Sequence, residues 1–267
     1  MLCCSHAFIA NKPIINKLAL FGALESDIIL ETPPSIQQMM IDVAKSMLEW
    51  KNSTVVQSST AGFINIPLPV TGGTDLDDWP GGILQKYSVL RPMIQETLGY
   101  LKFQKNAIDE RKYLGYSGEE DAVGLWEDCG YKIVCHITPD TLDYIRSMSN
   151  WRDNSEALIC INPQLFLDPL SKQESIDFVA GANDIYLLES LNMRGPNALP
   201  CRGLLYRAFP DKYKAARRLD GGGYVVIAEY DKKPIRSQLE EIFLEDSKIR
   251  DKDLSLADRA KRYIPSF

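Results

Sequence analysis

The sequence predicts an α/β protein with a mostly parallel β-sheet and helices on both faces of the sheet. An antiparallel pair of strands at the end of the sheet is an open alternative. Short apolar runs alternate with segments of helical periodicity along most of the chain. One run, ALICIN at residues 157–162, is apolar almost throughout, as is typical of a strand buried on both faces of a parallel sheet. We expect a single α/β domain over residues 32–236, followed by a helical tail over 237–267.

The composition narrows the class of protein. The chain has 267 residues, of which 45% are hydrophobic and 25% charged, which is ordinary for a globular fold. Its net charge is −6 and its Lys and Arg residues are scattered, so a nucleic-acid partner is not expected. No uninterrupted apolar run reaches the roughly 18 residues that a transmembrane helix needs. We therefore expect a soluble or peripheral protein.

The cysteines and histidines suggest no catalytic chemistry. Cys135 and Cys160 lie in apolar runs, where cysteine behaves as a small hydrophobic residue, so disulfides are not expected. Cys129, Cys135 and His136 lack the usual zinc-ligand spacing, and strand alternation points the last two to opposite faces. No nucleophile-elbow motif accompanies either histidine. The sequence thus leans towards a protein that is not an enzyme, and it identifies no cofactor.

Residues 1–31 differ from the rest. They contain no acidic residue before Glu25 and carry Lys12 and Lys17. Two interpretations stay open: the remnant of an organelle-targeting segment, or an N-terminal arm that packs loosely.

The first elements are the most clearly patterned. Ser35 suits a helix N-cap, and apolar residues at helical spacing after it predict a helix over 35–50. Residues 62–68 should form a strand that is ended by Pro67 and Pro69. A second helix should begin at Ile83 and contain Pro92. Its buried face is expected to comprise Ile83, Tyr87, Leu90, Ile94, Leu98 and Leu101.

The helices and strands after residue 101 are predicted from shorter sequence patterns. Residues 102–121 are polar and read as a loop or insertion. We expect helices over residues 122–128, 139–148, 171–181 and 210–219, and strands over 131–138, 157–162, 184–189, 203–209 and 224–230.

The acidic loop DLDDWPGG, between the first strand and the second helix, is the main candidate site. A loop at the carboxyl end of a strand is where α/β folds bind ligands. Asp77 and Asp78 suit a divalent metal, an amine or a basic partner at least as well as a bare phosphate. Alternatively, they cap the turn, Trp79 fills the core, and Gly81 and Gly82 only allow the chain to bend.

Two further residues join the predicted ligand-binding set. Asn162 and Arg207 lie near the ends of predicted strands, and an arginine there suits a phosphate group. If they converge with Asp78, the site would hold a metal–phosphate complex. They could equally serve as cap and salt-bridge residues.

Six motifs follow one another through the chain: PPS, IPLP, DDWPGGI, INPQL, IYLL and GLLYRAFP. With these motifs the chain resembles a family of cyanobacterial and plastid proteins that share a domain of unknown function. That domain occurs in low-photosystem-II-accumulation proteins and is appended to some plastid adenylate kinases.

The resemblance implies a plastid location, in the chloroplast stroma or peripheral to the thylakoid. It also implies a helper role in assembling photosystem II, with thylakoid or photosystem assembly proteins as partners. Our first hypothesis is therefore a non-enzymatic plastid accessory protein that supports assembly of photosynthetic complexes. The alternative is a nucleotide- or phosphometabolite-binding protein, or an enzyme, that uses the acidic loop.

Overall fold

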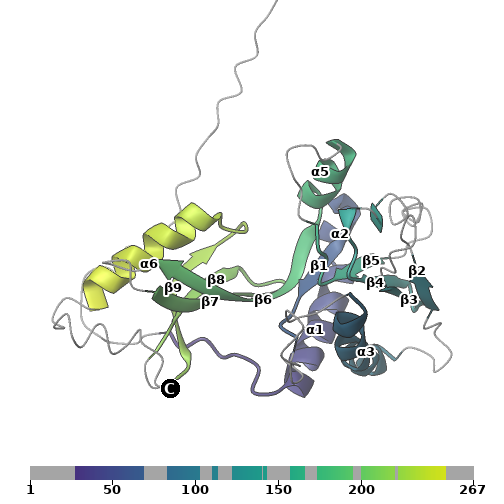
Figure 1. The fold of residues 1–267 in the computed structure, drawn as a ribbon, viewed down its shortest axis with the longest axis horizontal. Coiled ribbons are helices and arrows are strands. Elements are labelled where there is room, and N and C mark those ends of the chain that lie inside the picture. Colours follow the sequence, from purple (N-terminus) through teal and green to yellow (C-terminus); the bar gives the residue numbers. More distant parts are fainter. Residues whose placement is uncertain are drawn as a thin grey trace, which may run out of the picture. The chain divides into compact units, whose positions relative to one another are not determined.

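The computed structural model describes residues 28–68, 83–102, 110–113, 122–139, 141–142, 157–165, 173–194, 200–219 and 222–250 (Figure 1). The helices are α1 (Ile36–Lys51), α2 (Val55–Ser58), α3 (Ile83–Tyr100), α5 (Gln173–Ala180) and α6 (Arg236–Arg250). The strands are β1 (Gly62–Asn65), β2 (Glu110–Tyr113), β3 (Ala122–Asp128), β4 (Tyr131–Cys135), β5 (Ala157–Ile161), β6 (Asn183–Arg194), β7 (Pro200–Ala208), β8 (Tyr213–Arg218) and β9 (Tyr224–Tyr230).

The chain divides into two compact units, which are described separately. The larger unit comprises Glu31–Ser190 and Leu204–Asp211. The smaller unit comprises residues 28–30 and the described parts of Leu191–Gly203 and Lys212–Phe267. Strands β6 and β7 each contribute residues to both units.

Several predicted elements are confirmed. Helix α1 begins where expected, and the Ser35 hydroxyl accepts a hydrogen bond of 3.1 Å from the backbone N–H of Gln38. Helix α3 begins at Ile83 and contains Pro92. Strands β5 and β9 and helix α5 fall within the predicted ranges or match them. Most of the helix predicted over 139–148 lies outside the described residues.

The sheet of the larger unit is mixed, so the prediction of a mostly parallel sheet is wrong. Its strands run in the order β2-β3-β4-β5-β1-β6-β7. The pairs β4–β5, β5–β1 and β1–β6 are parallel. The pairs β2–β3 and β3–β4 are antiparallel, because these strands form hairpins instead of helical crossovers.

The β3–β4 hairpin explains two errors. A two-residue turn joins the strands, and both of its residues are left-handed: Cys129 has φ 52° and Gly130 has φ 72°. Such turns match the twist of paired strands. The segment predicted as a short helix over 122–128 is therefore strand β3. Strand β2 lies within the predicted loop 102–121 and pairs with β3.

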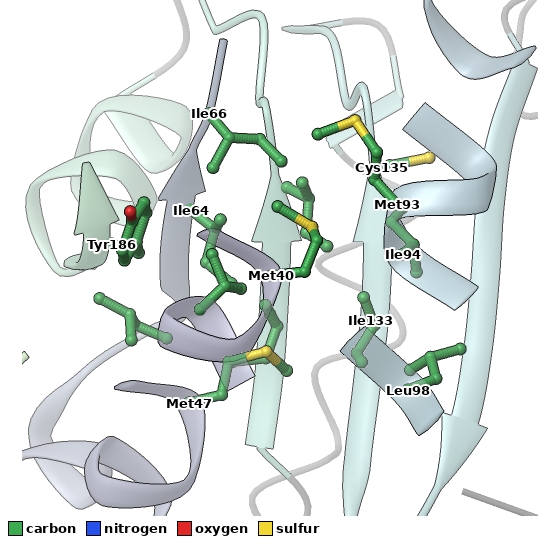
Figure 2. Packing of buried hydrophobic residues seen from close by; sticks show 14 of the residues in the cluster. Met40, Met47, Ile64, Ile66, Met93, Ile94, Leu98, Ile133, Cys135 and Tyr186 are labelled. Carbon is green, nitrogen blue, oxygen red and sulfur yellow. The ribbon is translucent and has the colours of Figure 1, made fainter. Parts of the chain in front are cut away.

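Two hydrophobic clusters lie on opposite faces of the central strands, because their side chains alternate. On one face, methionines and isoleucines of α1 and α3 pack against Ile64, Ile133 and Ile159 (Figure 2). On the other face, Phe178 of α5 packs with the neighbouring strand residues Phe63, Val134, Leu158 and Cys160. The central strands are thus buried on both faces, which explains their almost wholly apolar sequences.

The smaller unit contains an antiparallel pair of strands, β8 and β9, which α6 follows in the chain. The basic helix predicted over 210–219 is therefore wrong: the segment forms β8 and turns back through the left-handed Gly222 and Gly223. Gly203 allows close packing, since a Cβ atom there would lie 2.5 Å from the Ala216 carbonyl oxygen and collide with the Phe243 ring. Within the described residues, no helix has the length and hydrophobicity needed to cross a membrane.

An ion pair ties β8 to α6. Arg217 Nη1 lies 2.9 Å from Asp246 Oδ2, and the two side chains are only 7% and 12% exposed. Replacing Arg217 by Met should lower the free energy of unfolding by about 3–5 kcal/mol, because the Asp246 carboxylate would stay buried and lose the guanidinium of this pair.

Urea denaturation of the purified variant would measure this change. The matched control is Arg236→Met, which breaks an exposed pair with Glu240, also at 2.9 Å, and should cost less than about 1 kcal/mol. Equal losses in the two variants would contradict the prediction.

Candidate functional site

Most of the predicted loop site lies outside the described residues. This holds for Asp77, Asp78, Trp79, Gly81 and Gly82. Their binding of a ligand stays a prediction. Asn162 and Arg207 are described, and the structure shows what each contacts.

Asn162 joins β5 to the end of β1. Its side-chain oxygen accepts a hydrogen bond of 2.8 Å from the Ile66 backbone N–H, and its amide nitrogen donates one of 3.0 Å to the Ile66 carbonyl. Its own backbone N–H donates to the Ile64 carbonyl at 2.7 Å. The side-chain amide of Asn162 therefore bonds to the Ile66 backbone as a neighbouring strand would, and it extends the hydrogen bonding between β5 and β1 beyond their carboxyl ends.

Arg207 lies near the end of β7. Its Nε donates to the Asp211 carbonyl at 3.0 Å, and its guanidinium lies 5.8 Å from the Phe209 ring centroid. Strands β1 and β6 separate β5 from β7. At about 4.8 Å per strand, Asn162 and Arg207 are roughly 14 Å apart, too far to bind one phosphate together.

A buried histidine stands beside Asn162 at the carboxyl end of β4. His136 is 0% exposed and left-handed (φ 54°), and its backbone N–H donates to the Ile161 carbonyl at 3.0 Å. Neither ring nitrogen has a hydrogen-bond partner among the described residues. Burial lowers the pKa of His136 to about 4; backbone groups of Lys86 and Asn162 near the ring raise it in part, and the charge of Lys86 lowers it. The imidazole is therefore neutral at pH 7.

A surface pocket of about 600 Å³ lies in the larger unit, between α1 and the end of β7, and we call it the α1–β7 pocket. It is lined by Glu31, Thr32, Pro33 and Pro34, by Gln38, Asp42, Lys45, Ser46 and Glu49 of α1, and by Tyr206, Ala208, Phe209, Pro210 and Asp211. Its wall thus combines acidic side chains with proline and aromatic rings.

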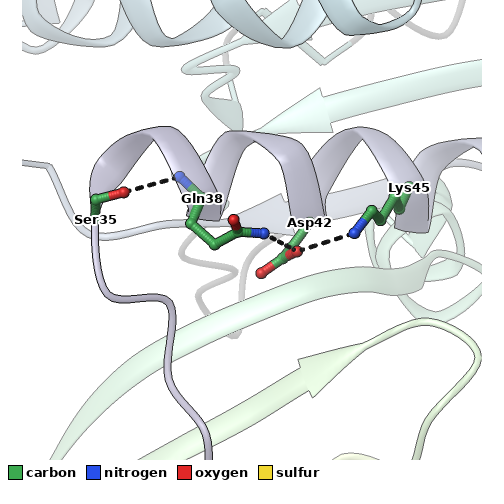
Figure 3. Close-up of polar contacts among 4 residues, drawn as sticks. All are labelled: Ser35, Gln38, Asp42 and Lys45. Atoms are coloured by element: carbon green, nitrogen blue, oxygen red, sulfur yellow. Dashed lines mark hydrogen bonds and ion pairs between the residues drawn. The ribbon is translucent and has the colours of Figure 1, made fainter.

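Asp42 occupies the middle of the polar face of α1 (Figure 3). Its Oδ1 accepts a hydrogen bond of 2.9 Å from Gln38 Nε2 and lies 3.8 Å from Lys45 Nζ. Two tyrosines lie close enough for the Asp42 charge to act on them. Burial raises the pKa of Tyr186 and of Tyr206, and the negative charge of Asp42 raises both further. Both phenols therefore stay protonated at neutral pH.

The pocket was not predicted from the sequence. Its residues come from 31–49 and from 206–211, which are far apart in the chain, although the motifs PPS and GLLYRAFP supply part of the lining. From the sequence, His136 was considered as a zinc ligand and as part of a nucleophilic triad, and neither role was supported. Across the residues that the structure describes, no group of three or more His, Cys, Asp or Glu side chains is placed to hold a metal ion.

The fold and the pocket together define an α/β protein with an acidic surface pocket. A family described as a domain of unknown function (DUF1995) matches residues 35–241, which is most of the chain, and the chain belongs to that family. Comparison with curated proteins and with solved structures found no significant match.

His136 should make stability depend on pH. Its pKa is about 4 in the folded protein and about 6.5 when unfolded, so between these values the unfolded chain binds more protons. The free energy of unfolding should therefore fall by about 2 kcal/mol from pH 7 to pH 5 on account of this group.

Urea titrations at several pH values between 5 and 7 would measure the dependence. His136→Gln should reduce it, whereas His6→Gln, at the other histidine of the chain, should leave it unchanged. Loss of the dependence in both variants, or in neither, would contradict the assignment.

Proposed function

We propose that the protein is a non-enzymatic plastid accessory protein that binds a basic segment of a partner protein in the α1–β7 pocket. By doing so it supports the assembly of photosynthetic complexes such as photosystem II, in the stroma or at the thylakoid surface. The resemblance of the motifs supports the compartment and the complex. The chemistry of the pocket supports the mode of binding.

The charge of the pocket is the observation that carries the proposal. Glu31, Asp42, Glu49 and Asp211 contribute four carboxylates to its lining, against the single ammonium of Lys45. Opposed charge across an interface speeds encounter and selects the partner. A pocket with this excess of negative charge favours a basic polypeptide over an anionic metabolite.

The apolar part of the lining suits an extended peptide. Pro33, Pro34 and Pro210 lose no side-chain entropy when a partner covers them. The half-buried rings of Tyr206 and Phe209 add flat surface against which a backbone can lie. The α1–β7 pocket thus combines rigid proline and aromatic rings with charged side chains, as do surfaces of other proteins that bind extended peptides.

Capture from chloroplast extract would test the proposal. The wild-type protein should retain a thylakoid or photosystem assembly protein, and Glu49→Lys should retain several-fold less of it, because the exposed rim charge is reversed. Quantitative mass spectrometry of the retained proteins is the measurement.

Asp177→Lys is the matched control, since it reverses an exposed acidic residue on α5 that does not line the pocket. This variant should retain the partner like the wild type. The proposal fails if Glu49→Lys and Asp177→Lys retain the same proteins, or if no thylakoid or assembly protein is retained.

A second candidate function is binding of a nucleotide or phosphorylated metabolite by the acidic loop. The observation that favours it is His136, a fully buried neutral imidazole near backbone groups of Lys86 and Asn162. It lies at the carboxyl end of β4, close to Lys86 in the first turn of the helix that follows the loop. A neutral imidazole there would serve as a hydrogen-bond donor or acceptor.

Thermal unfolding against nucleotides and sugar phosphates, with and without magnesium, would test this candidate. A ligand at 100 times its dissociation constant should add about 2.7 kcal/mol. The resulting rise in Tm, at about 2–4 °C per kcal/mol, should disappear in Asp78→Asn. A shift that persists in Asp78→Asn would remove the loop from the site, and no shift with any compound would leave the loop without a ligand role.

A further inference from the structure

A short segment of the chain pairs with β9 along the edge opposite β8. The segment is Ile28–Leu30, and we call it the edge segment. Ile29 forms an isolated antiparallel bridge with Val225. On either side of this bridge, the Ile28 carbonyl accepts a backbone hydrogen bond of 2.8 Å from β9, and the Leu30 N–H donates one of 2.9 Å to it. The outer edge of β9 therefore accepts an added strand.

Few contacts hold the edge segment in place. Leu30 is buried, with 6% of its surface exposed, whereas Ile28 and Ile29 are 67% and 55% exposed. One apolar side chain and two backbone hydrogen bonds thus account for most of the attachment. Segments with so few buried contacts open readily while the rest of a protein stays folded.

The connection that follows the edge segment favours its exchange between chains. The edge segment belongs to the smaller unit, and the next residue, Glu31, already belongs to the larger one. Only residues 31–34 lead from it to the Ser35 cap of α1, and two of them are the adjacent Pro33 and Pro34. Proline fixes its own backbone and restricts that of the residue before it. Short, stiff connections promote exchange of the element that they carry.

We propose that the edge segment of a second copy of the chain can occupy the outer edge of β9, so that two copies join by exchanging these residues. Each copy gives one segment and receives one, which closes a symmetric dimer. Both hydrogen bonds and the burial of Leu30 are kept in the exchanged form. This inference does not depend on the proposed function.

The bridge provides the test. The two hydrogen bonds flank Ile29 and Val225, so these residues form a non-hydrogen-bonded antiparallel pair. The Cα atoms of such a pair lie about 4.5 Å apart, which is within the range that a disulfide can span. A full-length variant with both Ile29→Cys and Val225→Cys should therefore form a disulfide within one chain when it is oxidised in dilute solution.

Mixing the two single variants reveals exchange. Neither full-length Ile29→Cys nor full-length Val225→Cys can close the bridge within its own chain. When the two are mixed and oxidised, a disulfide between chains should form. A tenfold rise in protein concentration should raise the cross-linked fraction about tenfold in the dilute range, because the segment of a second chain competes with one held by its own chain. Mass spectrometry of the linked peptides distinguishes this bond from those of the six native cysteines.

Two controls separate exchange from random contact. Ile29→Cys mixed with Glu229→Cys, an exposed position of β9 outside the bridge, should give at least tenfold less cross-linking. Adding Leu30→Asp to the Ile29→Cys chain should lower cross-linking with Val225→Cys by about tenfold or more, because a carboxylate replaces the buried side chain. Ile28→Asp, at the exposed neighbouring position, should change it less than about twofold.

Three results overturn the proposal. The first is no cross-link between the mixed variants at concentrations up to about 1 mM, the range of effective concentration within one chain, while the double variant closes its bridge. The second is a double variant that forms no disulfide within one chain, since the pairing with β9 would then be absent. The third is a cross-link that Leu30→Asp and Ile28→Asp affect equally.

Discussion

The packing of α1 against the central strands is the constraint on which the larger unit depends. Met40, Met47 and Trp50 are buried on one side of this helix, against residues of β1, β4 and β5. The same burial fixes the opposite side, because helical periodicity leaves Asp42 and Lys45 to face the pocket. The core and the candidate site are thus two faces of one helix, and a change that rotates α1 alters both.

Elements with a clear period could be predicted from the sequence. Helix α1 combines a capping serine with apolar residues at helical spacing, and α3 repeats that spacing over several turns. Strand β5 is apolar throughout because neighbouring strands and helices cover it on both faces. In each case the signal is local, since the residues that make the pattern also make the element.

The errors and omissions share a different cause. In each case the structure of a segment depends on a turn or on a contact with residues distant in the chain. Residues 213–218 read as a basic helix, yet they pair with β9, and Arg217 finds its counterion on α6. Residues 122–128 became a strand because Cys129 and Gly130 form a hairpin turn. The side-chain hydrogen bonds from Asn162 to Ile66 are an omission of the same kind, and ligand binding by Asn162 stays a prediction. The convergence of Asp42 and Tyr206 on one pocket is equally non-local.

Strands β6 and β7 are shared between the two units, and this limits where the chain can be divided into domains. The chain leaves the larger unit within β6 and returns to it within β7, so neither unit is a continuous stretch of the gene. A single break at either crossing removes part of both units. A boundary placed at either crossing would therefore divide both units, and the family match over residues 35–241 includes parts of both.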